Sequence, residues 1–156
     1  MKEHFLDLIA YEQWANNAIT YSLVKIEELP PKALSFMSHI IDAQITWLDR
    51  IKNIETNVRV WQDYSIEEIS GKLNTSSSDL KDYVNSIRNE DLEKIITYKN
   101  TKGERFQSSL EDILTHLIIH SSYHRGQIIL LIKPVVPVLP YTDYIHYART
   151  VRDHSA

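Results

Sequence analysis

Two histidines placed four residues apart are the first candidates for chemistry in this chain. His120 and His124 lie in a strongly helical stretch, and residues four apart on a helix project from nearly the same face. Two imidazoles at that spacing can bind one ion. A third imidazole from a neighbouring helix would complete a three-histidine site with one open coordination position, which is typical of catalytic metal sites.

The third ligand has two candidates. His116 lies four residues before His120, and His39 lies in a helical stretch far upstream. Each step of four residues moves about 6 Å along a helix axis, so three consecutive histidines cannot easily reach one ion. A ligand from a different helix is geometrically easier, but spacing alone does not separate His39 from His116.

The position of the histidine pair on its helix supports a shared ion. At 100° per residue, His124 lies about 40° from His120 and Gln127 about 20° to the other side, so all three face the apolar seam. A lone histidine there is usually a hydrogen-bonded core residue. Burying two imidazoles without partners costs several kcal/mol, and one ion would satisfy both. Gln127 is expected to contact a ligand or a buried backbone group, whereas Arg125 is expected to face outward.

Two polar residues interrupt the apolar stripe of the first helical segment. Glu12 and Asn16 fall nearly in line with Phe5 and Leu23, at helical spacing. They are interpreted either as a polar patch at one end of a helix bundle or as the lining of a pocket around the metal. Both interpretations stay open from the sequence.

Composition limits the possible chemistry. The chain has 156 residues, of which 43% are hydrophobic and 24% are charged, values typical of one globular domain. It contains no cysteine, so disulfides, thiolate metal sites and cysteine nucleophiles are excluded, and any reacting thiol must come from a ligand. The net charge of -4 without a dense Lys/Arg cluster argues against a nucleic-acid partner.

Targeting signals are not evident in the sequence. The start lacks the apolar core of a signal peptide, and the longest aliphatic run, 128–132, is far shorter than a membrane span. The sequence therefore predicts a cytoplasmic protein that is not inserted in a membrane.

Apolar periodicity and capping patterns predict four long helices in a single domain over residues 1–156. Serines 76–78 could instead form a loop, but the apolar residues around them keep helical phase. A short hairpin or extended loop is expected before the last long helix. The fold class is therefore all-α, a four-helix bundle. The expected helices cover 2–27, 32–54, 65–88 and 108–133, and the hairpin covers 94–107.

The last long helix is apolar on both sides. Leu114, Ile118 and Ile129 lie on the face opposite the histidines, and a helix that is apolar all round must be covered on both sides. The cover is either a partner subunit or the C-terminal tail. The pattern favours a homodimer in which this helix contributes to the interface.

The chain resembles the DinB family over nearly its full length. The resemblance rests on the segment Tyr-Glu-Gln-Trp-Ala-Asn at 11–16, on His39, on the H-x3-H-x2-YHRGQ signature in 116–128, and on the closing segment 139–145. It implies an up-down-down-up four-helix bundle, often dimeric, with a divalent metal, commonly zinc or nickel. The implied ligands are His39, His120 and His124, which decides between His39 and His116.

The resemblance also suggests a reaction. Relatives in the same superfamily include metal-dependent thiol transferases that use bacillithiol or mycothiol. The leading hypothesis is therefore a thiol S-transferase, in which the metal deprotonates an external low-molecular-weight thiol that attacks a small-molecule substrate. Glu12 and Asn16 could orient that thiol, and the absence of protein cysteine fits an external one.

Two other functions compete with thiol transfer. A metal-dependent hydrolase would use the same open position to lower the pKa of a bound water to about 7, with Glu12 or Asp42 as the only candidate bases. The third alternative is a metal-binding stress-response bundle without turnover. In that case the fourth coordination position should be filled by protein or sealed from solvent.

Overall fold

Helices make up most of the chain, for which a computed structural model describes residues 1–59 and 61–152. The prediction of a mostly helical protein with a small hairpin before the last long helix is confirmed. The two strands pair antiparallel, with Thr97 opposite Gln107. The elements are α1 (Lys2–Leu23), α2 (Pro31–Lys52), α3 (Ile66–Ser86), the 3-10 helix η1 (Asn89–Glu93), β1 (Ile95–Lys99), β2 (Arg105–Ser109), α4 (Leu110–Ile132) and α5 (Tyr144–Thr150).

Local side-chain chemistry explains where the long helices begin. Pro31 stands at the first position of α2, where its missing N–H costs no hydrogen bond. The Ser65 hydroxyl accepts from the Glu68 amide at 3.3 Å, and the Glu68 carboxylate accepts from the Ser65 amide at 2.9 Å, a complete capping box. Ser109 caps α4 by accepting from the Asp112 amide at 3.0 Å.

The end of the first helix differs from the prediction. Helix α1 ends at Leu23 rather than near residue 27. The Lys25 and Ile26 amides donate to carbonyls only three residues back, so the chain tightens into a turn before the proline pair. Helix α3 continues through serines 76–78, as its apolar phase predicts.

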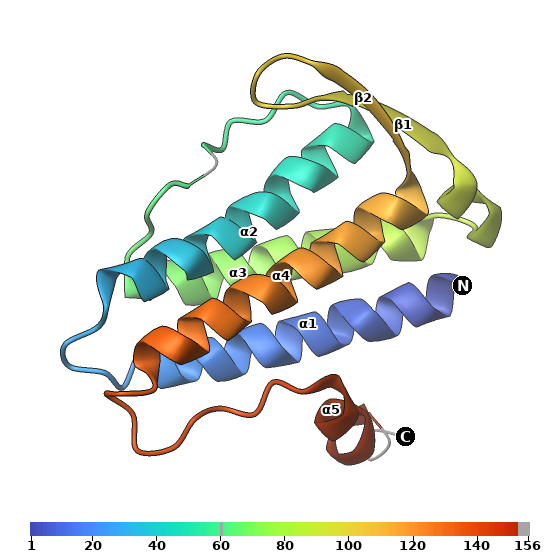
Figure 1. The fold of residues 1–156 in the computed structure, drawn as a ribbon. Helices are drawn as coiled ribbons and strands as arrows, with labels where there is room; N and C mark the ends of the chain where they lie inside the picture. The colour runs from blue at the N-terminus through green and yellow to red at the C-terminus, as the bar shows by residue number, and fades with distance from the viewer. Residues whose placement is uncertain (60, 153–156) are drawn as a thin grey trace.

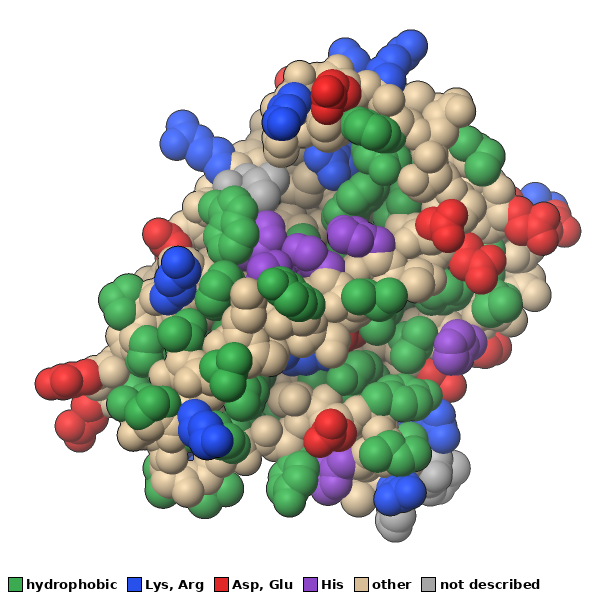
Figure 2. Space-filling model, viewed as in Figure 1, with side chains coloured by type: hydrophobic (Ala, Val, Ile, Leu, Met, Phe, Trp, Pro, Cys, Tyr) green, Lys and Arg blue, Asp and Glu red, His purple; other side chains and the backbone are tan. Residues whose placement is uncertain are grey.

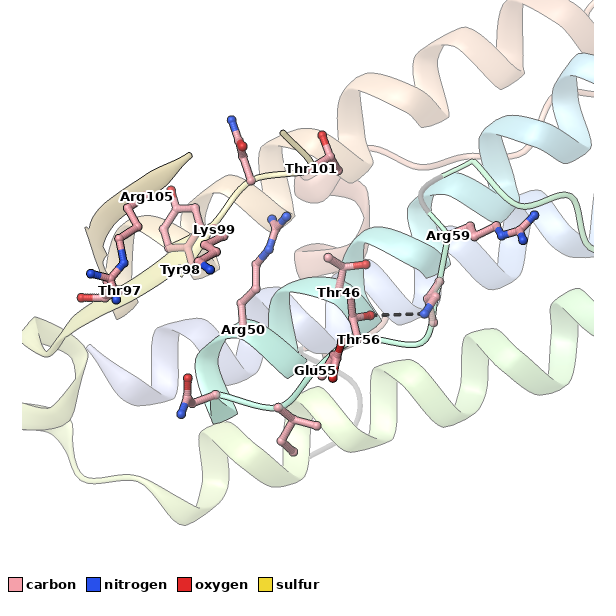
Figure 3. A pocket seen from close by; sticks show the side chains of 14 residues that line it. Thr46, Arg50, Glu55, Thr56, Arg59, Thr97, Tyr98, Lys99, Thr101 and Arg105 are labelled. Carbon is pink, nitrogen blue, oxygen red and sulfur yellow. Dashed lines mark hydrogen bonds between the residues drawn. The ribbon is translucent and has the colours of Figure 1, made fainter. Parts of the chain in front are cut away.

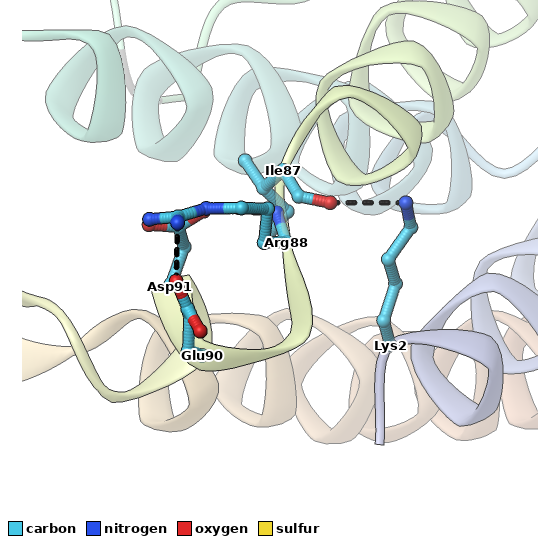
Figure 4. A network of polar contacts seen from close by, with 5 residues as sticks. All are labelled: Lys2, Ile87, Arg88, Glu90 and Asp91. Atoms are coloured by element: carbon cyan, nitrogen blue, oxygen red, sulfur yellow. Dashed lines mark hydrogen bonds and ion pairs between the residues drawn. The ribbon is translucent and has the colours of Figure 1, made fainter.

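The long helices run in two directions. In Figure 1, α1 and α4 run one way and α2 and α3 the other, and the segment between α2 and α3 returns along the length of α2. Helix α2 packs on α4 and α3, and α1 packs on α3 and α4. The start of α1 is joined to the end of α3, because the Lys2 ammonium donates to the carbonyl of Asn85 at 2.7 Å and to that of Ile87 at 2.9 Å. Figure 4 shows the bond to Ile87.

The apolar core is divided along the helix axes. One large cluster includes Phe5 and Leu117, a second includes Ile19 and Ile128, and a small third one joins Tyr11 and Ala15 to Tyr147. Buried polar side chains occupy the positions between the first two clusters on α1, α3 and α4. They are Glu12, Asn16, Ser76, Ser77, Ser121, His124 and Arg125.

The face of α4 opposite the histidines is covered within the chain. Leu114 is buried in the first apolar cluster, and Ile129 packs on the second together with Val136 and Leu139 of the C-terminal tail. The sequence predicted that either a partner subunit or the C-terminal tail covers this face, and the tail covers part of it. No helix in the described part of the chain has the length and apolarity needed to cross a bilayer.

Candidate metal centre

The packing of α2 on α4 brings the three predicted histidines together. His39 comes from α2, and His120 and His124 come from α4; one ligand atom from each lies within 4.8 Å of the others. The Nε2 atoms of His39 and His120 are 3.1 Å apart. Two nitrogens bound tetrahedrally to one ion at 2.0–2.1 Å would be about 3.3 Å apart. This pair therefore has the spacing of two ligands of one ion, and the group of three could hold a metal ion. Figure 2 shows histidine side chains bordering a surface hollow.

The three imidazoles are held in the neutral form that binds metal. Burial lowers the pKa of His39 to about 4, with a further contribution from the His124 charge. Burial lowers the pKa of His120 to about 3, and the neighbouring histidines add to that effect. The pKa of His124 is also lowered by burial. Because metal competes with protons for imidazole nitrogen, these groups need no deprotonation at neutral pH.

Gln127 orients one of the three rings. Its side-chain carbonyl oxygen accepts from the Nδ1 of His124 at 2.6 Å, which places the ring proton on Nδ1 and leaves Nε2 free for an ion. Such outer contacts fix the tautomer and direction of metal-binding histidines. Gln127 was predicted to face inward, and its specific contact is this hydrogen bond to His124.

Trp61 covers another of the three rings and was not identified from the sequence. Its ring lies flat on His39, with centroids 3.7 Å apart and planes within 3°. Trp61 adopts a positive φ of 73°, which is uncommon for a bulky residue. The His39 Nδ1 is buried and has no hydrogen-bond partner in the described residues, so stacking on Trp61 and the contact of Nε2 with His120 restrain this ring.

Asp42 anchors the segment that carries Trp61. Its two carboxylate oxygens accept from the Tyr64 hydroxyl at 2.7 Å and from the Gln62 amide at 3.1 Å. This bonding pattern closes the segment after Trp61 onto α2. Asp42 therefore has a structural contact, and it is not free to act as the base that a hydrolase would need.

His116, the alternative third ligand, lies outside the group. Its ring is 5.4 Å from the His120 ring and packs against Trp47 at 5.3 Å. In the described residues, the histidines that gather around one point are His39, His120 and His124. The separation follows from the rise of the helix, since His116 is a further turn along α4.

Glu12 and Asn16 contact Arg125, on the α1 side of α4. The Arg125 guanidinium lies 2.7 Å from a Glu12 carboxylate oxygen and donates to Asn16 Oδ1 at 3.0 Å and to Tyr11 Oη at 3.1 Å. Arg125 is only 2% exposed, so the prediction that it faces outward is wrong. The face turned away from the histidines is covered by α1, which a helical wheel of α4 alone does not reveal.

Comparison with known proteins identifies a family for this chain. The DinB family model matches residues 1–152. The chain belongs to the DinB family. Among curated proteins, none matches the chain. Within 116–128 of this DinB protein, His120 and His124 face α2 whereas Arg125 faces α1.

The donor set limits which ion suits this DinB centre. Three imidazole nitrogens favour zinc, nickel or copper, whereas magnesium and calcium prefer oxygen ligands. The three side chains carry no compensating negative charge, so a bound ion would keep its full charge. This supports the predicted class of divalent metal.

Replacing Gln127 with alanine is expected to weaken zinc binding by about 10–100-fold, the usual cost of losing an outer contact to a ligand histidine. Competition with a chromophoric chelator measures the affinity. Gln13→Ala, a glutamine on α1, is the matched control and should leave the affinity unchanged. Equal affinities of Gln127→Ala and the wild type would remove Gln127 from the metal centre.

Proposed function

We propose that this DinB protein is a metal-dependent thiol S-transferase that uses a low-molecular-weight thiol of the bacillithiol or mycothiol kind. The observation that carries the proposal is the group of three neutral imidazoles, two buried and one half-buried, that borders a surface hollow. A closed structural site would need a fourth protein ligand. In the described residues, no cysteine, aspartate or glutamate joins these three histidines.

The residues of the chain have separable tasks in this proposal. The three imidazoles would hold a zinc or nickel ion, which when bound lowers the pKa of a coordinated thiol. Gln127 directs the His124 ring, and Trp61 restrains the His39 ring by stacking. The chain has no cysteine, so the thiol is supplied from outside and its small-molecule acceptor would lie in the same hollow.

Hydrolysis gains no support from the carboxylates considered for it. Glu12 is paired with Arg125 on the far side of α4, and Asp42 is bonded to Tyr64 and Gln62. A hydrolase would need a base beside the ion. Thiol transfer needs no such base once the thiol is ionised, and we therefore place it first.

Metal analysis is the experiment that tests the centre. Untagged protein, purified without added metal, is expected to contain about one divalent ion per chain by mass spectrometry. His39→Ala, His120→Ala and His124→Ala should each lose it, whereas His4→Ala, an exposed histidine on α1, should keep it. A wild type without stoichiometric metal, with all variants folded, would overturn the metal-dependent proposal.

A thiol-transfer assay then separates the enzymatic proposals. Metal-loaded protein is expected to speed the consumption of a thiol by an electrophile and to leave a panel of esters and amides unchanged. Ester or amide cleavage would favour the hydrolase. Stoichiometric metal with no turnover in either assay would instead leave a metal-binding bundle of the stress-response kind.

We further propose that the long helices form the up-down-down-up bundle of the family and that two chains associate. The helix directions in Figure 1 support the first point. Ile119, Tyr123 and Leu130 support the second, because they are 64%, 65% and 71% exposed and lie within about 40° of one another on α4. An exposed apolar stripe of this kind is typical of an interaction surface.

Light scattering tests the association. The wild type is expected to have the mass of two chains, and Leu130→Lys is expected to have the mass of one, because a buried ammonium without a partner is strongly unfavourable. Val138→Lys, which changes a residue 76% exposed in the tail, is the control and should remain dimeric. A single-chain mass for the wild type would contradict the proposal.

A further inference from the structure

A basic cleft lies between α2, the segment that follows it and the hairpin. Its volume is about 830 Å³, and its charged lining comprises Arg50, Arg59, Lys99 and Arg105 against the single carboxylate of Glu55. Figure 3 shows Arg50 extending from α2 toward the hairpin, which carries Lys99 and Arg105. The chain as a whole has a net charge of -4. This concentration of positive charge is therefore local to the cleft.

Arg50 is the cation best placed to bind a ligand. It is half-buried, and its guanidinium carbon lies 4.7 Å from the Trp47 ring centre and 5.5 Å from that of Tyr98. In the described residues it forms no ion pair and donates no hydrogen bond to a side chain. Its planar fork of donors, held over aromatic rings, remains available for a carboxylate or phosphate.

The cleft and the metal centre share one face of α2. Thr46 and Arg50 follow His39 by 7 and 11 residues, so both lie within about 20° of it around the helix. Thr46 is 3% exposed and lines the cleft, and its buried hydroxyl has no hydrogen-bond partner among residues 1–59 and 61–152. This unpartnered hydroxyl lies between His39 and Arg50 on α2. Along the axis, His39 and Arg50 are about 16 Å apart.

On the side of α4, aromatic rings lie between Arg50 and the metal centre. Trp47, under the Arg50 guanidinium, contacts His116 at 5.3 Å between ring centres, and His116 contacts His120 at 5.4 Å. Figure 2 shows Lys or Arg atoms and histidines on the wall of the same hollow. Side-chain contacts therefore run from Arg50 through Trp47 and His116 to His120 at the metal centre.

We propose that this cleft binds the anionic end of an elongated small molecule, with Arg50 as the main anchor, while the other end of the molecule reaches the three histidines. The ligand class is a thiol or acceptor that carries a carboxylate or a phosphate. The part of this proposal that concerns the histidines rests on the proposed function, in which a thiol reacts at the metal centre. The anion site itself depends on neither metal nor turnover.

Binding of simple anions to metal-free protein tests the anion site alone. Succinate and inorganic phosphate are titrated into isotope-labelled protein and followed by amide chemical shifts. Saturable shifts are expected around Thr46, Arg50 and the hairpin, and the anion that binds tighter identifies the chemical group. Absence of saturable binding by both anions overturns the proposal.

Variants at position 50 determine whether Arg50 is the anchor. Arg50→Met keeps the length and the packing on Trp47 but removes the charge, and is expected to weaken anion binding at least tenfold, the cost of losing a charge-assisted hydrogen bond. Arg50→Lys should retain much of the affinity, and Arg88→Met, an exposed arginine in another region, should match the wild type. Equal affinity in Arg50→Met, with thermal unfolding showing it folded, overturns the assignment.

A matched pair of thiols tests the link to the metal centre. Glutathione has two carboxylates, and its diethyl ester has the same thiol with both carboxylates masked as neutral esters. Zinc-loaded wild type is expected to bind glutathione at least tenfold tighter, and Arg50→Met should lose that preference while keeping its zinc. If the wild type did not bind zinc, the proposed function would be overturned, whereas the binding of simple anions at Arg50 would be unaffected. No preference in the wild type would overturn the link.

Discussion

Replacing Arg125 with alanine is expected to lower the free energy of unfolding by about 3–5 kcal/mol, the range found when one partner of a buried ion pair is removed. Arg125 is 2% exposed and Glu12 is 3% exposed, so water cannot replace the lost guanidinium. Burial already raises the pKa of Glu12, and Arg125 opposes that rise. Without Arg125, the Glu12 carboxyl must remain protonated or be left as an unpaired buried charge.

Arg125 also supports three neutral partners. It donates to Asn16 Oδ1 at 3.0 Å, to Ser121 Oγ at 2.8 Å and to Tyr11 Oη at 3.1 Å. Tyr11 in turn donates to the Thr142 carbonyl at 2.7 Å, which joins α1 to the C-terminal tail. Truncation at Arg125 therefore leaves several buried polar atoms without partners, each with its own desolvation cost.

Urea unfolding at neutral pH measures this loss. Arg88→Ala is the control, because Arg88 pairs with Glu90 and Asp91 at the surface, where an ion pair contributes about 1 kcal/mol or less. The double variant Glu12→Leu/Arg125→Met removes both charges and should recover part of the stability lost in Arg125→Ala. An Arg125→Ala protein as stable as Arg88→Ala would show that the buried pair does not stabilise the fold.

Local patterns in the sequence predict much of this structure. Capping of α3 by Ser65 and Glu68, the position of the hairpin and the continuity of α3 through serines 76–78 all follow from contacts within a few residues. The spacing of His120 and His124 likewise places them on one face of α4. These features do not depend on how the helices pack.

Features that depend on packing were missed or misplaced. Arg125 is buried because α1 covers its side of α4, and Trp61 lies on His39 because Asp42 draws the returning segment onto α2. The choice of His39 over His116 likewise required the family resemblance. In each case the partner is more than 15 residues away in the chain, so helical periodicity carries no information about the contact.

Adding zinc in excess is expected to raise the unfolding temperature of metal-free wild-type protein by about 10 °C. A ligand at about 1,000 times its dissociation constant stabilises the native state by about 4 kcal/mol, and for a domain of this size each kcal/mol shifts the midpoint by about 2–4 °C. His120→Ala should show no such shift, because its Nε2 lies 3.1 Å from that of His39 and both are needed to hold the ion. Differential scanning calorimetry with and without a chelator measures the effect.

The metal-free baseline of His120→Ala distinguishes a metal centre from a structural cluster. If the histidines served only to pack α2 against α4, truncation of His120 would lower the midpoint without metal and zinc would add nothing to the wild type. A metal centre predicts the reverse, since two neutral imidazoles facing each other at 3.1 Å contribute little until an ion joins them. His116→Ala is the matched control, because His116 lies one turn away and outside the group. His116→Ala should keep the full rise in unfolding temperature on adding zinc. If this variant lost the rise, the ion would be bound by a different set of histidines.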